Sequence, residues 1–174
     1  GQVDFYSVQD GSFGKKLKTL NAELPSDATS FATSAPFQGY YAFGLKDGTV
    51  MVVAPKFLVT FPNNERKLTP RLDFPLGEMA LEVDEQGSAI KRFAFSHYED
   101  RTAVVALTED KRVLFSSFVA EENMFTGEVE WVVERTELDV EGRVDELLMS
   151  PDTTRTFVRS ANQVYVYDTR DPSD

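Results

Sequence analysis

The stretch that decides the fold is YAFGLKDGTVMVV, residues 41–53. Two runs rich in aromatic and β-branched residues flank the polar turn Lys46-Asp47-Gly48. Such residues suit a pleated, half-buried surface, and Asp-Gly supplies the positive φ that a tight turn between antiparallel strands requires. The stretch therefore predicts a β-hairpin.

This hairpin pattern recurs along the chain. A polar turn followed by an alternating run occurs four times, and the anchor valines of these runs, Val3, Val50, Val113 and Val164, are 47, 63 and 51 residues apart. Four-stranded propeller blades repeat about every 40 to 50 residues. The turns expected before the last two valines are Glu109-Asp110-Lys111 and Ser160-Ala161-Asn162.

Two further strands complete each expected unit. An earlier strand is predicted at 28–35, 90–96 and 144–150, ending in the turns Ser34-Ala35-Pro36, Ser96-His97-Tyr98 and Ser150-Pro151-Asp152. A fourth strand is predicted at 15–23, within 57–61, and at 129–136. The total is roughly thirteen strands with no clean helical stripe. The sequence thus predicts an all-β fold, a partial β-propeller-like array of about three four-stranded antiparallel blades.

The expected domain organisation is one propeller-like region over 1–174, a piece of a larger domain. Its blade-like units are 1–24, 28–62, 88–137 and 143–170, with an insertion at 54–88. Four prolines of this insertion are expected to break regular pairing, so that this proline-rich excursion runs along an edge or outside the sheets. Because so few blades cannot close a ring, we expect self-association or an open arrangement. The prolines are Pro55, Pro62, Pro70 and Pro75, and Asn63-Asn64 predicts a turn between them.

Composition narrows the function. The 174 residues include 18 Lys and Arg against 29 Asp and Glu, a net charge of −11, which argues against a nucleic acid partner. The chain has no cysteine, which excludes disulfides, thiolate nucleophiles and zinc–sulfur sites. No apolar run approaches the roughly 18 residues that a membrane span needs, so we expect a soluble domain.

Candidates for catalysis are few. The single histidine, His97, lies in Ser96-His97-Tyr98-Glu99-Asp100, which contains the residue types of a hydrolase triad. Triad members normally come from separate segments that converge, whereas consecutive turn residues diverge, so a simple turn is the favoured interpretation. No catalytic residue is assigned.

Acidic pairs and the one tryptophan have equally plain interpretations. The pairs could offer oxygen ligands to calcium, but none has the loop spacing of a specific calcium site, and solvated loops are favoured; no metal or cofactor is assigned. Trp131 alternates as a strand residue and is expected in the core or between blades. The pairs are Asp84-Glu85, Glu99-Asp100, Glu109-Asp110 and Glu121-Glu122.

Basic residues form two clusters. On an alternating strand Lys16 and Lys18 share one face and could hold an anion, but protection of an exposed edge strand by lysine is the more frequent explanation. These clusters and the asparagine turn are the predicted interaction surface. It consists of Arg66, Lys67, Arg71, Asn63, Asn64, Lys15, Lys16 and Lys18.

Two family resemblances follow from these residues. Residues 144–168 resemble a degenerate WD repeat that lacks the Gly-His pair and has Tyr167 where Trp is usual. The series GLKDG (44–48), FLVTFP (57–62), RKLTP (66–70) and FPLGE (74–78) resembles the large soluble domain of long PstC-type permeases of phosphate ABC transporters, and a weaker similarity extends over most of the chain.

The second resemblance implies a propeller-like domain inserted after the first transmembrane helix of an inner-membrane permease, on its periplasmic side. The expected function is a non-catalytic accessory or regulatory domain that binds proteins. Its expected partners are the periplasmic phosphate-binding protein or other transporter subunits, and its contact with the membrane runs only through the missing transmembrane part of its parent. The alternatives are a propeller-type metal-dependent hydrolase, whose carboxylates would converge from several blades, and a purely structural assembly module.

Overall fold

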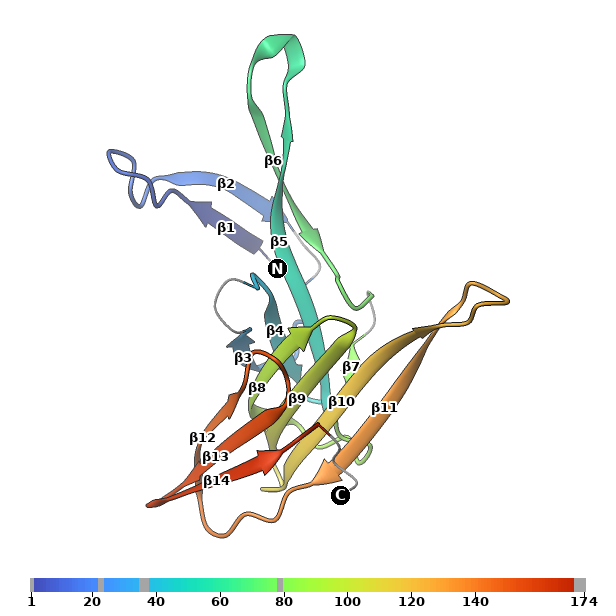
Figure 1. The fold of residues 1–174 in the computed structure, drawn as a ribbon. Helices are drawn as coiled ribbons and strands as arrows, with labels where there is room; N and C mark the ends of the chain where they lie inside the picture. Colours follow the sequence, from blue (N-terminus) through green and yellow to red (C-terminus); the bar gives the residue numbers. More distant parts are fainter. Residues whose placement is uncertain (1, 22–23, 35–37, 78–79, 171–174) are drawn as a thin grey trace.

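The computed structural model describes residues 2–21, 24–34, 38–77 and 80–170. This part of the chain contains fourteen strands and one short 3-10 helix. The strands form four antiparallel sheets, and none of the sheets closes on itself (Figure 1). The predicted all-β class is confirmed.

A four-stranded sheet with the order β11-β10-β9-β8 lies in the middle of the molecule. Five consecutive residues of β9, from Thr102 to Ala106, are fully buried, so this strand is covered on both faces. Its Val-Ala run therefore lacks the alternation of a half-exposed strand. The strands are β8 (Ile90–Tyr98), β9 (Arg101–Thr108), β10 (Val113–Glu122) and β11 (Val129–Glu137).

The sheet before it in the chain has the order β3-β4-β5-β6, and the short β7 pairs with the start of β5. The first half of β5 is buried, whereas beyond Ala54 the strand pairs only with β6 and leaves the body as a long hairpin (Figure 1). The 3-10 helix η1 (Pro62–Asn64) forms the tip. The strands are β3 (Ala28–Thr33), β4 (Tyr41–Leu45), β5 (Thr49–Thr60), β6 (Lys67–Asp73) and β7 (Leu81–Glu82).

The two remaining sheets are smaller. One contains β12 (Val144–Met149), β13 (Arg155–Ser160) and β14 (Gln163–Asp168), and its outer strand β14 has no fourth strand beside it among the described residues. The other is the hairpin of β1 (Gln2–Tyr6) and β2 (Lys16–Asn21).

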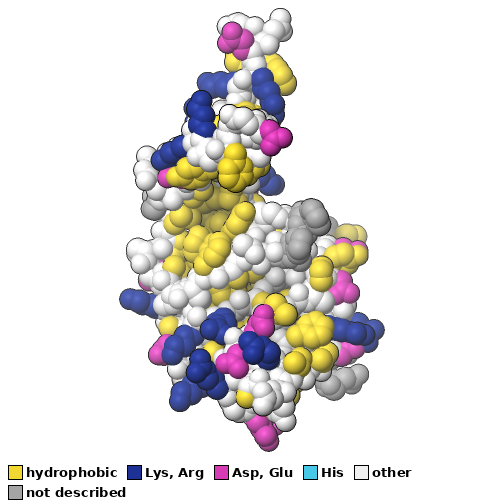
Figure 2. Space-filling model, turned by 90° about the vertical axis from the view of Figure 1, so that its left-hand side faces the viewer, with side chains coloured by type: hydrophobic (Ala, Val, Ile, Leu, Met, Phe, Trp, Pro, Cys, Tyr) yellow, Lys and Arg dark blue, Asp and Glu magenta, His cyan; other side chains and the backbone are white. Residues whose placement is uncertain are grey.

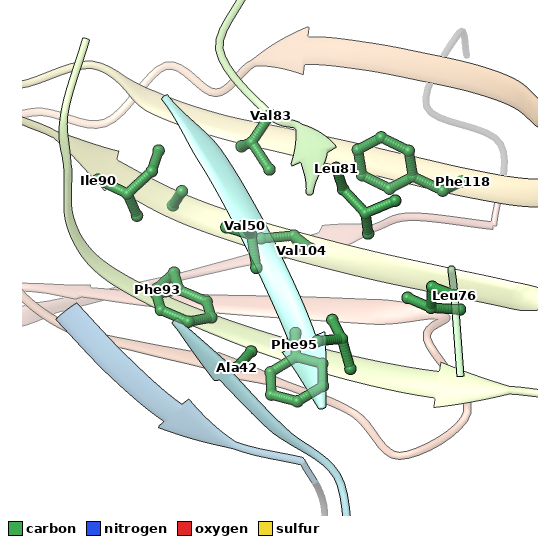
Figure 3. Packing of buried hydrophobic residues seen from close by; sticks show 12 residues of the cluster. Ala42, Val50, Leu76, Leu81, Val83, Ile90, Phe93, Phe95, Val104 and Phe118 are labelled. Carbon is green, nitrogen blue, oxygen red and sulfur yellow. The ribbon is translucent and has the colours of Figure 1, made fainter. Parts of the chain in front are cut away.

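The core consists of two clusters, one on each face of the middle sheet. Val104 and Phe95 point toward Val50 and Ala42 of the β3–β6 sheet (Figure 3). Val105, the neighbour of Val104, points the opposite way and belongs to the cluster that includes Leu147 and Val158 of the β12–β14 sheet. Because successive strand residues alternate between faces, β9 contributes to both clusters, and three sheets stack face to face around it.

Polar contacts also join the sheets. The Thr29 and Ser30 hydroxyls, next to each other on β3, both donate to the Ile90 carbonyl of β8 at 2.7 Å. On the other side, the Arg101 guanidinium of β9 donates to the Thr169 carbonyl at 2.6 Å. These contacts fix β3 and β14 relative to the middle sheet.

Two strand predictions need correction. The fourth strand predicted within 57–61 is not a separate strand, because residues 57–60 are the end of β5; the strands that pair with β5 on that side are β6 and β7. The turn predicted at Ser96-His97-Tyr98 lies later, since β8 runs to Tyr98 and Glu99-Asp100 forms the turn, with Glu99 at φ 55°.

The proline-rich segment projects outside the stacked sheets, but it keeps regular pairing, contrary to the prediction. Pro55 pairs with Leu72 and Phe57 with Pro70, two positions apart in one uninterrupted register. Both prolines therefore fall in the same alternating class of pairs, the one in which the ladder needs no N–H from them. The expected Asn63-Asn64 turn is confirmed, with φ of 54° and 64°. The Ser34-Ala35-Pro36 turn lies partly outside the described residues.

Candidate functional site

The predicted interaction residues gather on one projecting part of the molecule. We call residues 2–21 and 54–73 the basic arm; it comprises the β1–β2 hairpin and the β5–β6 hairpin (Figure 1). Lys and Arg side chains stand among hydrophobic ones on this part of the surface (Figure 2). The two basic clusters, far apart in the sequence, thus lie on one structure.

Aromatic packing connects the two hairpins. The Phe5 ring of β1 meets the Phe57 ring of β5 edge to face, with centroids 4.6 Å apart. This geometry is favourable because the positive edge of one ring meets the negative face of the other. Phe57 nevertheless remains 38% exposed, so part of its ring is open to a ligand.

A groove of about 420 Å³ runs between β2 and the tip of the β5–β6 hairpin. It combines apolar side chains with three cations and the carboxylate of Glu65, and we call it the arm groove. Its lining consists of Leu17, Lys18, Phe57, Pro62, Glu65, Arg66, Lys67 and Leu68.

The cations of the arm fall into two groups. Lys16 binds Asp4 at 2.8 Å, and Asp73 binds both Lys56 and Arg71, at 3.2 and 2.8 Å. Hydrogen bonds from Lys16 and then from Thr19 lower the pKa of Asp4. The pKa of Asp73 is also lowered: its burial would raise it, but hydrogen bonds and charge from Lys56 and Arg71 outweigh this effect.

The cations that line the groove are free of such pairs. Lys18, Arg66 and Lys67 have no carboxylate partner within 4.0 Å among the residues that the structure describes. Their charge is therefore available to a ligand. Of the predicted surface, the structure brings Lys18, Arg66 and Lys67 together at the groove. Asn63 and Asn64 form the tip beside it, Lys16 and Arg71 are engaged in ion pairs, and Lys15 precedes β2.

The arm differs in charge from the rest of the chain. Its residues 2–21 and 54–73 include seven Lys and Arg but four Asp and Glu, a net charge of +3, although the whole chain carries −11. The remaining residues therefore carry −14. A basic projection on an acidic body favours a negatively charged ligand at the arm alone.

Below the arm groove lies an apolar hollow of about 310 Å³ between the arm and the body, visible as the hydrophobic band in Figure 2. Phe31 at its wall is 56% exposed and stacks on Tyr41, with centroids 6.0 Å apart. Apart from Asp4, the lining is apolar: Val3, Phe5, Leu24, Phe31, Tyr41, Phe43, Val53, Pro55 and Leu72.

Around His97 the structure does not bring a triad together. Ser96 and His97 are successive residues of β8 and point to opposite faces; the Ser96 hydroxyl is fully buried and makes no hydrogen bond. His97 Nδ1 lies 2.8 Å from the Thr102 hydroxyl, and the imidazole meets the Tyr40 ring edge-on. Burial lowers the pKa of His97, and the charge of Asp100 opposes this shift. These contacts give His97 a packing role between β8 and its neighbours.

Two of the acidic pairs, Asp84-Glu85 and Glu109-Asp110, likewise serve structure. Asp84 is 3% exposed and forms an ion pair of 2.7 Å with Arg112. Its carboxylate also accepts hydrogen bonds from the backbone N–H groups of Gln86 and Ser88. Arg112 also binds Asp110 at 2.8 Å. Within the described ranges no group of three or more His, Cys, Asp or Glu side chains is placed to hold a metal ion.

Sequence reasoning missed a second projection, the β10–β11 hairpin. Its residues 119–134, which we call the acidic arm, contain five Glu and no Lys or Arg. Trp131 lies here and is 38% exposed on the edge strand β11, so its predicted place in the core or between sheets is wrong. The signal was present in the sequence, because glutamates surround Met124 and Phe125 without any basic residue.

Comparisons of the chain with protein-family models, with curated proteins and with solved structures gave no match. In the described ranges, no helix has the length and apolar character needed to cross a bilayer.

Proposed function

We propose that this chain is a non-catalytic binding domain that presents the arm groove to an acidic segment of a protein partner. The observation that carries this proposal is the group of three unpaired cations, Lys18, Arg66 and Lys67, beside exposed apolar side chains in one groove. These three cations lie together in one groove, on a chain that otherwise carries an excess of acidic residues.

The chemistry of the groove favours a peptide-like ligand over a small anion. Leu17 and Phe57 offer apolar contact, which a bare phosphate cannot use. A protein segment with both carboxylates and a large apolar side chain would satisfy both halves of the groove. Arginine and aromatic side chains are also the types that dominate binding energy at protein interfaces.

Within this proposal, the three stacked sheets are blades of an incomplete propeller. The order of strands supports it, since each sheet contains neighbouring antiparallel strands in chain order and the β12–β14 sheet has one strand fewer than its neighbour. Loops and hairpins on such a rigid scaffold commonly carry recognition.

As part of the same proposal, the groove lies on the periplasmic side of a phosphate importer; the support for this is the resemblance of residues 41–78 to long PstC-type permeases. The β5–β6 hairpin contains two of the four resembling segments, 57–62 and 66–70. Candidate partners are then the phosphate-binding protein and the other subunits of that transporter.

Biolayer interferometry against the phosphate-binding protein and permease of the same organism tests this proposal. We expect saturable binding with a dissociation constant below the high micromolar range. The double variant Arg66→Glu/Lys67→Glu should weaken it more than about tenfold, because like charges would then meet across the interface. A matched control is Lys46→Glu/Lys111→Glu, which makes the same charge change at exposed turns of the body and should bind like the wild type.

Two results would argue against the proposal. Absence of wild-type binding at high micromolar concentration would remove the transporter partners. An equal loss in the groove variant and in the control would show that overall charge, rather than the groove, determines binding.

A further inference from the structure

The acidic arm has the chemical features of a ligand for the arm groove. At its tip Met124 is 95% exposed and Phe125 99% exposed, and glutamates flank them on both strands. Covering large apolar side chains at the end of a projecting hairpin is favourable, because it removes their apolar surface from water. The tip is therefore an apolar ligand inside an acidic collar, the counterpart of an apolar groove with cations.

Negative charges within the acidic arm repel each other. Glu121 and Glu130 are direct partners across β10 and β11, and like charges in this position repel each other. In the part of the chain that is described, Glu121, Glu122, Glu128 and Glu130 have no Lys or Arg within 4.0 Å. A basic partner would relieve this repulsion, whereas an isolated molecule cannot.

The acidic arm cannot reach the groove of its own molecule. The two projections leave the body in different directions, the β5–β6 hairpin away from the stacked sheets and the β10–β11 hairpin to one side (Figure 1). Both hairpins continue buried strands, since Phe118 of β10 and Val52 of β5 belong to the core. Bending either arm onto the other would break these strands.

We propose that the arm groove also takes the acidic arm of a second copy of this chain, so that copies assemble head to tail. This inference rests on the proposed function, because it treats the groove as a protein-binding surface. Phe125 and Met124 would enter the groove beside Phe57 and Leu17, and the glutamates would face Arg66 and Lys67. A groove of about 420 Å³ is in the size range that accepts large ligand groups.

The geometry of this contact dictates how assembly continues. Two different surfaces meet, so a pair of copies keeps one free groove and one free acidic arm, and further copies add until a ring closes or a chain extends. A transporter partner that occupies the groove would compete with this assembly.

Sedimentation velocity of the full chain over a concentration series tests the inference. We expect the wild type to form dimers and larger species that weaken as salt rises, since the contact is largely ionic. The groove variant Arg66→Glu/Lys67→Glu and the arm variant Met124→Ser/Phe125→Ser, which removes the exposed apolar tip and keeps the glutamates, should each be monomeric by themselves.

A mixture of the two variants gives the decisive result. The arm variant retains an intact groove and the groove variant an intact acidic arm, so the mixture should form a one-to-one dimer and nothing larger. Recovery of the dimer also shows that both variants are folded.

Other outcomes would overturn the inference. A wild type that is monomeric at all concentrations and salts would do so, as would a mixture that stays monomeric. Oligomers that persist in both variants would assign self-association to open sheet edges. A monomer that co-sediments with phosphatidylglycerol vesicles through Arg66 and Lys67 would assign the groove to a lipid surface. Binding to the transporter proteins is measured separately, so a monomeric chain that still binds them refutes this inference but leaves the proposed function standing.

Discussion

At the scale of single residues, Arg112 has the most consequential position. It lies between Asp84, which is almost fully buried, and the half-exposed Asp110, and so holds the turn before β8 against the turn before β10. The pKa of Asp110 is lowered to about 2 by hydrogen bonds from Thr108 and Arg112. The pKa of Asp84 is also lowered: burial acts to raise it, but Arg112 and two backbone N–H groups prevail.

These shifts predict acid lability. A carboxylate whose pKa is lower in the folded state stabilises the fold above its unfolded pKa of about 3.9 and loses that contribution as pH falls through the folded value. We therefore expect the melting temperature to fall between about pH 4 and pH 2. In Arg112→Met both ion pairs are lost, so the protein should be less stable at pH 7 by about 3 kcal/mol.

The same variant should also respond less to acid. Protonation of Asp84 then relieves an unpaired buried charge, so the fall of the melting temperature between pH 4 and pH 2 should become shallower or reverse. Circular dichroism melts at both pH values check this prediction. Parallel pH curves for the wild type and Arg112→Met would contradict it.

Single residues also show where sequence reasoning succeeds and fails. The positive φ at Gly48 and at Asn63-Asn64 was predictable, because these residue types adopt it at low cost. In the turn after β13, however, Ala161 and not Asn162 has the positive φ, at 49°. The pairing registers of β12, β13 and β14 determine which turn residue takes it, and they were not visible in the local sequence.

At the scale of elements, the length of β5 determines the candidate site. Twelve residues continue from the core into the basic arm, through Pro55, because β6 is the only strand in the described ranges that pairs with β5 there and the Pro55–Leu72 pair needs no N–H from the proline. The sequence predicted strand in both halves but divided them into two strands. The prolines predicted an interruption of the strand, whereas the positions of Pro55 and Pro70 in the alternating pairs make them compatible with the ladder.

The β1–β2 hairpin depends on its packing against the β5–β6 hairpin for its order. A two-stranded hairpin is marginal in water, and the contact between Phe5 and Phe57 is its main aromatic anchor. In Phe5→Ala, amide hydrogen exchange in residues 2–21 should accelerate at least about tenfold, as loss of roughly 1.5 kcal/mol of local stability implies. Exchange in β8 to β10 should stay unchanged. A uniform acceleration over the whole chain would contradict this local role.

At the scale of the whole molecule, strand positions were largely predictable and the arrangement of sheets was not. Alternation and turn residues located most strands, including β4 to the residue. The stacking of three sheets around β9 depends on side chains such as Val104 and Val105, which have the same type but face different clusters. The meeting of Lys18 with Arg66 and Lys67 likewise depends on how two hairpins pack, which no local pattern specifies.

The separation of charge between the two arms gives the molecule a direction. A basic arm with an apolar groove projects from one part of an acidic body, and an acidic arm with an apolar tip projects from another. Opposite charges on separate arms promote encounter in one orientation and disfavour the alternatives. The interaction surfaces that we propose therefore lie on the two hairpins that leave the stacked sheets rather than on the sheets themselves.

Site-specific photocrosslinking tests most directly the central claim that the arm groove of one copy binds the acidic arm of another. With p-benzoylphenylalanine in place of Leu17, whose side chain lines the groove, we expect crosslinks between copies that map by mass spectrometry to residues 119–134. The same label in place of Lys46, on the body, should give none. Crosslinks from position 17 scattered over the surface, or no more frequent than from position 46, would contradict the account.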